Sequence, residues 1–311
     1  MDRIDAMKVF VAALDAGSLS AAGRRLGRSP AAVSRAIAFL EHHVGTELLH
    51  RTTRVLKLSE AGERYAFACR RILGDLEEAD LNAAGERAAP RGTLTLSAPP
   101  ISGEQILQPI VDAYLDAFPG VSVNLVLLDR PVNLVEEGID VALRVGELPD
   151  SSLVALRVGG DVKRVVVAAP RYLAAHPRID EPADLLKHRI VTTTHFGHDS
   201  WIFPPLAGSA VPRTVHFKPR LVVNSVRAAL ASAVAGHGVT RLYTYHVADR
   251  VRDGSLQILL REAEAAAMPV HLIVPQGRLS VPKVRAFVDF AAPRLRAEFA
   301  RLSAEVGAVG T

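Results

Sequence analysis

The segment SLSAAGRRLGRSPAAVSRAIAFLEHHV, residues 18–44, predicts two short helices joined by a tight turn. Gly27 ends the first helix, and Ser29 followed by Pro30 begins the second. A serine hydroxyl caps a helix N-terminus, and proline suits the first helical position because its missing N–H has no partner there. Two helices in this arrangement form a helix-turn-helix, whose second helix enters the major groove of DNA.

Positive charge is concentrated in the same region. Residues 1–58 hold nine basic and five acidic side chains, and residues 24–57 hold seven and two, although the whole chain of 311 residues carries only +4. A local basic patch is the electrostatic footprint of a polyanion. Charge alone fits a solvated basic surface equally well, so the DNA interpretation depends on the patch and the helices together.

The run LLHRTTRVLKLS, residues 48–59, is compatible with a small two-stranded wing that has Arg51 and Arg54 near its turn. Arginine in a wing neutralises phosphate or reaches into the narrow minor groove. The alternative is three small helices that only pack together. We expect double-stranded operator DNA as the partner, contacted by Ser18, Ser20, Arg28, Ser29, Pro30, Ala31, Ala32, Ser34, Arg35, Arg51 and Arg54.

A long helix is predicted over residues 59–88. Apolar residues from Ala61 to Ala79 recur every three or four positions, and no proline interrupts them. The apolar stripe needs a partner, either the same helix of a second chain or the body of its own chain. Cys69 lies in this helix and is interpreted as a small buried residue rather than a redox sensor.

The stretch from DAMKVF to LKLSEAG, within residues 2–62, resembles the N-terminal signature of LysR-type transcriptional regulators. RVGELPDSSLVA (144–155) and VNSVRAALASAVAGHGV (223–239) fit the same family. The resemblance implies a winged helix-turn-helix over residues 1–58, a dimerisation helix over 59–88 that packs antiparallel on its copy, and an effector-binding domain over 92–311. It also implies a homodimer or a tetramer built from dimers.

Residues 92–311 predict an α/β fold. Strands and helices alternate, which favours a parallel sheet with covering helices; a short helix is expected at 134–135 and a strand at 239–242. Two lobes joined by crossings near 160–164 and 265–269 resemble the periplasmic-binding-protein fold. We expect one lobe from 92–161 plus 269–301 and the other from 162–268.

In open α/β sheets, ligands bind beyond the carboxyl ends of the strands. That rule selects a set of effector-site candidates: Ser97, Pro100, Ile101, Ser102, Gly146, Thr194, His195, Asn224, Thr240 and Arg241. Any single one of them is an ordinary cap or strand end on its own, so the prediction rests on their convergence.

A small organic acid is the predicted effector, because an arginine suits a carboxylate. Either Arg241 clamps this acid, or the side chains around it partly fill the pocket. Arg144 is a second cation or a structural residue. An aromatic acid is favoured if Tyr243, Phe196 and Trp201 line one side.

Other classes of protein are less consistent with the sequence. One cysteine rules out a disulfide framework and multi-cysteine metal sites. Gly236 and Gly238 lack the third glycine of a dinucleotide-binding motif. Ser280 and Lys283 have the Ser-x-x-Lys spacing of a catalytic pair, but Pro282 opens a helix there, so chance explains the spacing better. We therefore expect no enzyme, no cofactor and no bound metal. The N-terminus does not resemble a secretory signal and no apolar run has membrane-spanning length, so a cytoplasmic protein without membrane contact is expected.

Overall fold

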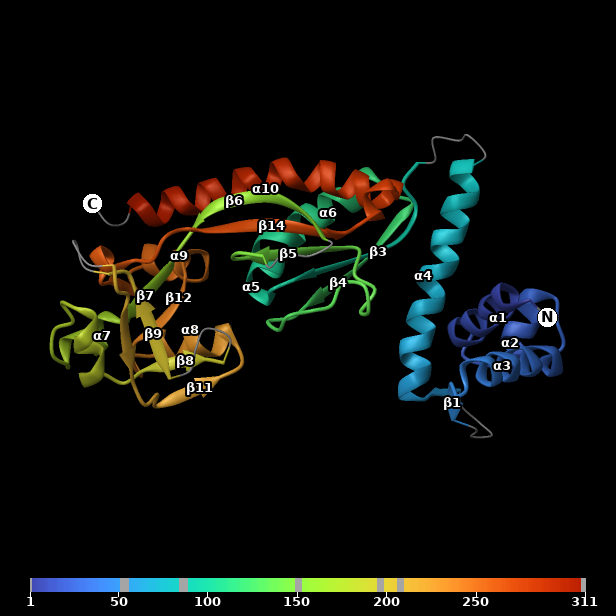
Figure 1. Ribbon diagram of the computed structural model, residues 1–311, viewed down its shortest axis with the longest axis horizontal. Coiled ribbons are helices and arrows are strands. Elements are labelled where there is room, and N and C mark those ends of the chain that lie inside the picture. The colour runs from blue at the N-terminus through green and yellow to red at the C-terminus, as the bar shows by residue number, and fades with distance from the viewer. Residues whose placement is uncertain are drawn as a thin grey trace. The chain divides into compact units, whose positions relative to one another are not determined.

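The computed structural model describes residues 2–50, 56–83, 89–148, 153–194, 199–205 and 210–308. The chain divides into two compact units, residues 1–92 and 93–311 (Figure 1). Each unit is described by itself below.

The N-terminal unit contains the predicted helix-turn-helix. Its helices are α1 (Arg3–Asp15), α2 (Leu19–Leu26) and α3 (Pro30–Val44). Fully buried residues from α1 and α3, including Phe10, Val33 and Leu40, form its core. At Gly23, a Cβ atom would lie 2.5 Å from the carbonyl oxygen of Arg28, so only glycine lets the α2–α3 turn fold back this closely.

Two short strands follow, β1 (Leu49–His50) and β2 (Lys57–Leu58), and they pair antiparallel. Helix α4 (Glu60–Ala83) begins directly after Ser59, whose hydroxyl accepts a hydrogen bond from the backbone N–H of Gly62 at 2.9 Å. A Cβ atom on Gly62 would lie 1.9 Å from the carbonyl oxygen of Leu48. The wing and the start of α4 are therefore packed backbone against backbone.

Part of the apolar stripe of α4 packs within its own unit. Ala66 and Cys69 are buried in the core of their own unit, as the alternative interpretation proposed for the whole stripe. Burial raises the pKa of the Cys69 thiol to about 11. Leu76, further along the helix, is 37% exposed.

Lobe 1 of the second unit has a five-stranded sheet. Its order is β4-β3-β5-β14-β6, where β3 is Gly92–Ala98, β4 Val121–Leu127, β5 Val141–Val145, β6 Leu153–Val162 and β14 Met268–Pro275. β3 is parallel to β5, but β14 is antiparallel to both β5 and β6. The predicted parallel pairing is found between β3 and β5, whereas β14 is antiparallel to its neighbours because the chain returns from lobe 2 in the opposite direction.

Helices cover this sheet. The segment after β3 forms α5 (Pro100–Ser102), a π-helical turn η1 (Gly103–Leu107) and α6 (Gln108–Ala117), and the chain ends in α10 (Pro282–Ala308). The short helix expected at 134–135 is a turn instead.

Lobe 2 contains a three-stranded sheet with order β12-β7-β13, made of β7 (Arg164–Ala168), β12 (Thr240–Tyr243) and β13 (Gln257–Leu259). Strands β8 (Val191–Thr193) and β11 (Leu221–Val223) pair in parallel, and a bridge between Ile190 and Val239 connects them to this sheet. The helices are α7 (Pro170–Ala174), α8 (Val226–Val234) and α9 (Thr244–Arg252), with a 3-10 turn η2 (Pro182–Lys187). A hairpin of β9 (Ser200–Phe203) and β10 (Arg213–His216) completes the lobe.

The chain passes between the lobes at Lys163 and again between β13 and β14. The Lys163 ammonium lies 3.1 Å from the Glu264 carboxylate, so an ion pair joins the two crossing segments. Helix α10 lies along β6 and β14 (Figure 1). Its Phe287 ring packs edge-on against Tyr114 of lobe 1, and its Phe299 ring packs edge-on against Tyr245 of lobe 2.

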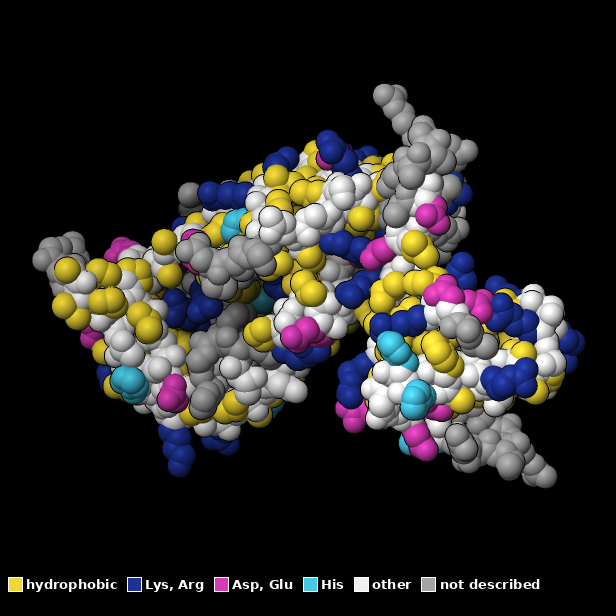
Figure 2. All heavy atoms as spheres, turned by 45° about the vertical axis from the view of Figure 1, so that its right-hand side comes forward, with side chains coloured by type: hydrophobic (Ala, Val, Ile, Leu, Met, Phe, Trp, Pro, Cys, Tyr) yellow, Lys and Arg dark blue, Asp and Glu magenta, His cyan; other side chains and the backbone are white. Residues whose placement is uncertain are grey.

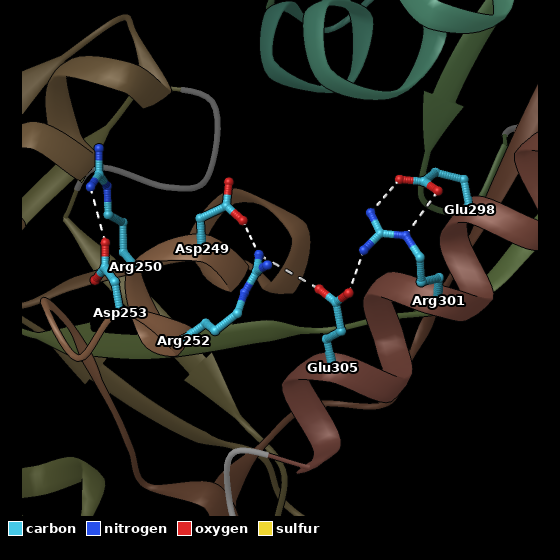
Figure 3. Close-up of polar contacts among 7 residues, drawn as sticks. All are labelled: Asp249, Arg250, Arg252, Asp253, Glu298, Arg301 and Glu305. Carbon is cyan, nitrogen blue, oxygen red and sulfur yellow. Dashed lines mark hydrogen bonds and ion pairs between the residues drawn. The ribbon is translucent and has the colours of Figure 1, made fainter.

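The end of α10 is tied to α9 by charged side chains (Figure 3). Arg301 pairs with Glu298 and Glu305 of its own helix, and Glu305 also pairs with Arg252 of α9 at 3.7 Å. Helix α10 therefore braces both lobes.

Candidate DNA interface and effector site

The outer face of α3 is exposed to solvent. Its solvent-facing residues share a helical spacing of three and four: Ala31, Ser34, Arg35, Ala38 and His42. Three of the five have very small side chains, so a surface such as a base edge can approach the helix closely. Arg35 is the one arginine in this stripe.

Ser18 and Ser29 are helix caps. The Ser18 hydroxyl accepts a hydrogen bond from the Ala21 N–H at 3.1 Å, and the Ser29 hydroxyl accepts one from the Ala32 N–H at 3.2 Å. Both side chains remain exposed. A capping hydroxyl keeps its own proton, which is available as a donor to phosphate.

Arg28 has a protein partner that the sequence analysis did not predict. Its guanidinium donates two hydrogen bonds, of 2.9 and 2.6 Å, to the two carboxylate oxygens of Asp5. This guanidinium holds the pKa of Asp5 below its ordinary value. The bidentate pair fixes α1 against the α2–α3 turn, which gives Arg28 a structural role beside the predicted one.

The wing residues Arg51 and Arg54 lie outside the described residues. The two strands that flank them are described, and they present His50 and Lys57 to solvent as a cross-strand pair. Lys57 belongs to the basic segment but was not among the predicted contacts. The position of Lys57 on a wing strand was the signal in the sequence that could have identified it as a DNA contact.

In lobe 1, the predicted effector residues lie at the carboxyl ends of β3 and β5. Ser97 is buried and accepts a hydrogen bond from the Arg144 guanidinium at 3.0 Å, while Arg144 also donates to the Leu143 carbonyl oxygen. Burial lowers the pKa of Arg144. These contacts favour the structural alternative for Arg144. Gly146 is held in the left-handed region, with a φ of +116°.

The segment after β3 is also largely buried. Ile101 and Ser102 are almost fully enclosed, and the Ser102 hydroxyl donates to the Pro99 carbonyl oxygen at 3.2 Å. Pro100 is partly exposed and occupies the first position of α5.

In lobe 2, two predicted residues come together at the carboxyl ends of β8 and β11. The Thr194 N–H donates to the Val223 carbonyl oxygen at 3.0 Å, which places Thr194 beside Asn224. Both side chains are exposed. Asn224 precedes Ser225, which caps α8. His195 lies outside the described residues.

Thr240 and Arg241 occupy a different place from the one expected. The predicted strand 239–242 put them near its end, but β12 begins at Thr240 and continues to Tyr243. Arg241 is 7% exposed and donates to the Ile202 carbonyl oxygen at 2.8 Å, with its guanidinium carbon 4.7 Å from the centre of the Phe203 ring. Burial, with a smaller contribution from Arg164, lowers the pKa of Arg241 to about 10. These contacts favour the alternative in which Arg241 fills space inside the lobe.

Tyr245 was not among the predicted effector-site residues, although the segment 239–245 was expected near the cleft. Because β12 ends at Tyr243, the segment beyond its carboxyl end is Thr244–Tyr245, at the start of α9. Tyr245 is buried, and its hydroxyl lies beside Ser102 of lobe 1. Burial raises the pKa of this phenol, so the hydroxyl keeps its proton.

Two of the three aromatic residues expected along the effector site, Trp201 and Tyr243, lie in different clusters. Trp201 is buried in a cluster inside lobe 2, where its ring packs edge-on against Phe217 at 4.9 Å. Tyr243 stacks on Tyr245 in a separate cluster that both lobes share. Phe196 lies outside the described residues.

The described residues contain no cluster of three or more metal-ligating side chains, and none of their helices is long and apolar enough to cross a membrane.

A helix-turn-helix with an exposed second helix, joined through a long helix to a two-lobed α/β domain, defines a ligand-responsive DNA-binding regulator. Residues 4–63 match the family described as "Bacterial regulatory helix-turn-helix protein, lysR family", and residues 87–296 match "LysR substrate binding domain". The chain belongs to the LysR family of bacterial transcriptional regulators. Members of this family bind DNA and small-molecule effectors and form oligomers.

Individual relatives cover nearly the whole chain. An HTH-type transcriptional repressor of Pseudomonas aeruginosa is 31% identical over 93% of this chain and 91% of its own length. The HTH-type transcriptional activator AaeR of Escherichia coli is 30% identical over 93% of each. Among solved structures, the LysR-type regulator CrgA of Neisseria meningitidis is 28% identical, with a TM-score of 0.60 and coverage of 94% and 98%.

Proposed function

We propose that this regulator reads its operator with the outer face of α3 and responds to a small organic acid bound between the lobes of residues 93–311. The observation that carries the proposal is the exposed stripe of α3, in which Arg35 stands among small residues. An N-terminal arginine of a recognition helix commonly makes a bidentate hydrogen bond to guanine. The names of relatives include a repressor and an activator, so the proposal assigns no direction of control.

The other DNA contacts divide by chemistry. The capping serines Ser18 and Ser29 and the wing residues Arg51, Arg54 and Lys57 contact phosphate or the minor groove, and Ser34 contacts base edges beside Arg35. Phosphate contacts position a protein on DNA, while base contacts specify the sequence. Arg35 therefore determines which operator is bound, and the wing determines mostly how tightly.

The effector site lies between Ser102, in the helical segment after β3 of lobe 1, and Thr194 and Asn224, which directly follow β8 and β11 of lobe 2. Asn224 lies beside the N-terminus of α8, where free backbone N–H groups favour negative charge, which suits an acid. A neutral ligand is the second candidate, since Arg241 and Arg144 already donate to protein atoms.

The protein acts as a homodimer or a tetramer built from dimers, in the cytoplasm where its DNA lies, without catalysis and without membrane contact. The part of α4 around Leu76 is the proposed dimer contact, since Ala66 and Cys69 are already buried within one chain. A charge introduced there by Leu76→Glu is unfavourable in an apolar seam. Sedimentation should show the variant dissociating at concentrations where the wild-type chain is dimeric. A monomeric wild-type chain contradicts the arrangement.

Selection of binding sites from random duplex DNA tests the operator proposal. Dimers with a helix-turn-helix select two half-sites spaced by whole helical turns. The purified chain should enrich such a paired site, and Arg35→Ala should lose the enrichment at one base position of each half.

A thermal-shift screen of small organic acids, with the matching amides as neutral controls and Asn224→Ala as the site variant, tests the effector. Equal stabilisation by acids and amides would favour the neutral ligand.

A further inference from the structure

Glu104 and Arg227 form an ion pair that joins the two lobes. Glu104 belongs to the π-helical turn η1 of lobe 1, and Arg227 is the second residue of α8 in lobe 2. Their side chains are 45% and 49% exposed, so solvent ions reach the pair. The contact lies close in sequence to the proposed effector residues Ser102 and Asn224 on its two sides.

The position of Arg227 within its helix favours a nearby anion. The N-terminus of a helix carries partial positive charge, which disfavours a cation in the first turn. Helix α8 has no acidic residue in its own first turn. Glu104 supplies the missing negative charge from the other lobe, and it occupies the first turn of η1, where an acid is favoured.

Other contacts between the two lobes lie next to the Glu104–Arg227 pair. Ser102, two residues before Glu104, lies beside the Tyr245 hydroxyl of lobe 2. Ile101 of lobe 1 belongs to the same hydrophobic cluster as Val226, the residue before Arg227. Ser102 and Glu104 therefore face lobe 2, with a buried contact inside and the ion pair at the surface.

We propose that the Glu104–Arg227 pair is a latch that favours the closed arrangement of the two lobes when no effector is bound. Arg227 differs from Arg144 and Arg241, whose guanidinium groups are buried and donate to protein atoms. An exposed ion pair shifts an equilibrium by only about two- to fivefold. A ligand with a modest preference for the released form is therefore enough to open the latch. An anionic effector, if the proposed function is right, would compete with Glu104 for Arg227.

The distance between the lobes measures the latch without any effector. Cysteines introduced at Ala113 of α6 and Ala231 of α8, both exposed, carry spin labels on lobe 1 and lobe 2. The native Cys69 is buried, so it does not compete for the label. Co-expression with unlabelled chain gives assemblies that contain one labelled chain, and double electron–electron resonance then gives the distances within it.

Glu104→Gln and Arg227→Gln should each raise the ratio of long to short distances about two- to fivefold. The exchanged pair, Glu104→Arg with Arg227→Glu, should restore the wild-type distribution. Glu137→Gln, which breaks the Arg130–Glu137 pair inside lobe 1, should leave it unchanged. Added sodium chloride should open the wild-type chain and have no effect on the Gln variants.

Unchanged distances in both Gln variants, or an exchanged pair that stays open, overturn the latch. Neither result bears on whether an acid binds between the lobes, because no effector is present in the measurement.

Discussion

Arg35 and Arg241 are arginines with opposite surroundings in the two units of the chain. Arg35 projects into solvent from α3, whereas Arg241 is 7% exposed, donates to the Ile202 carbonyl oxygen and lies over the Phe203 ring. An exposed guanidinium keeps its five donors for a phosphate or a base. The buried Arg241 guanidinium uses one Nη–H on the Ile202 carbonyl oxygen, while its Nε–H is buried without a partner among the described residues, which is unfavourable in the interior.

The contrast extends to the units themselves. The N-terminal unit directs its predicted functional side chains outward from a small, tightly packed core, while the effector domain encloses most of its own. Functional loss in the first unit should follow from lost contacts to DNA, and functional loss in the second should follow from lost stability.

Gly62→Ala should destabilise the N-terminal unit and abolish DNA binding, because the new Cβ would lie 1.9 Å from the Leu48 carbonyl oxygen. Overpacking costs about 1–3 kcal/mol, and a clash with backbone belongs at the upper end. Gly74→Ala is the matched control in the same helix, where a Cβ meets no atom within 4 Å. It should stabilise the helix by about 0.5–1 kcal/mol. Denaturant unfolding measures both changes, and equal effects would contradict the packing described here.

Arg241→Ala should lower the free energy of unfolding of the effector domain by about 1–3 kcal/mol, since it leaves the Ile202 carbonyl oxygen without its donor. Arg250→Ala removes an exposed arginine of the same lobe and should change stability by no more than about 0.5 kcal/mol. Urea unfolding of the full chain gives both values. An Arg241→Ala protein that is fully stable but loses its response to acids would place Arg241 in the effector site after all.

Arg35→Ala should weaken operator binding by about ten- to a hundredfold while stability stays unchanged, because one bidentate base contact is worth about 1–3 kcal/mol. Arg64→Ala removes an equally exposed arginine from α4 and should bind the operator as the wild-type chain does. Gel-shift titrations at fixed salt concentration compare the two. Equal losses would mean that Arg35 contributes only charge.

Acid should destabilise the effector domain through His246. Burial lowers the pKa of His246 to about 3, below the ordinary value of 6.5. The unfolded chain therefore takes up a proton that the folded chain does not, so stability falls as pH drops below about 6.5, by at most about 1.4 kcal/mol per pH unit.

His246→Asn should reduce this slope by up to one proton, measured by urea unfolding at about pH 6 and about pH 5. A wild-type slope that survives His246→Asn would assign the effect to other groups.

The residues of the N-terminal unit show how much local sequence can predict. The caps Ser18 and Ser29, the proline at position 30 and the left-handed Gly27 fixed the ends of α2 and α3, and the structure confirms these helices. Helical periodicity then identified the exposed face. Arg28 is the exception, because its partner Asp5 lies 23 residues away and no local pattern marks it.

Strand boundaries in the effector domain were harder to predict. A difference of one residue at the end of β12 moved Thr240 and Arg241 away from the strand's carboxyl end and brought Tyr245 beside Ser102. The β9–β10 hairpin, α9, β6 and β13 were not predicted. Short strands lack caps, and their ends are set by their neighbours in the sheet rather than by their own residues.

The sequence by itself determined the helix-turn-helix, the long α4 and the family, because helix ends and apolar stripes depend on residues a few positions apart. Only the tertiary structure decided that β14 runs antiparallel, that Arg241 packs on Phe203, and that Glu104 meets Arg227. The residues in these contacts are 38 to 131 positions apart in the sequence, and they lie on different strands or different lobes. Their geometry exists only once the sheets have formed. Their energies depend on burial and on the paired group, neither of which is a property of one stretch of sequence.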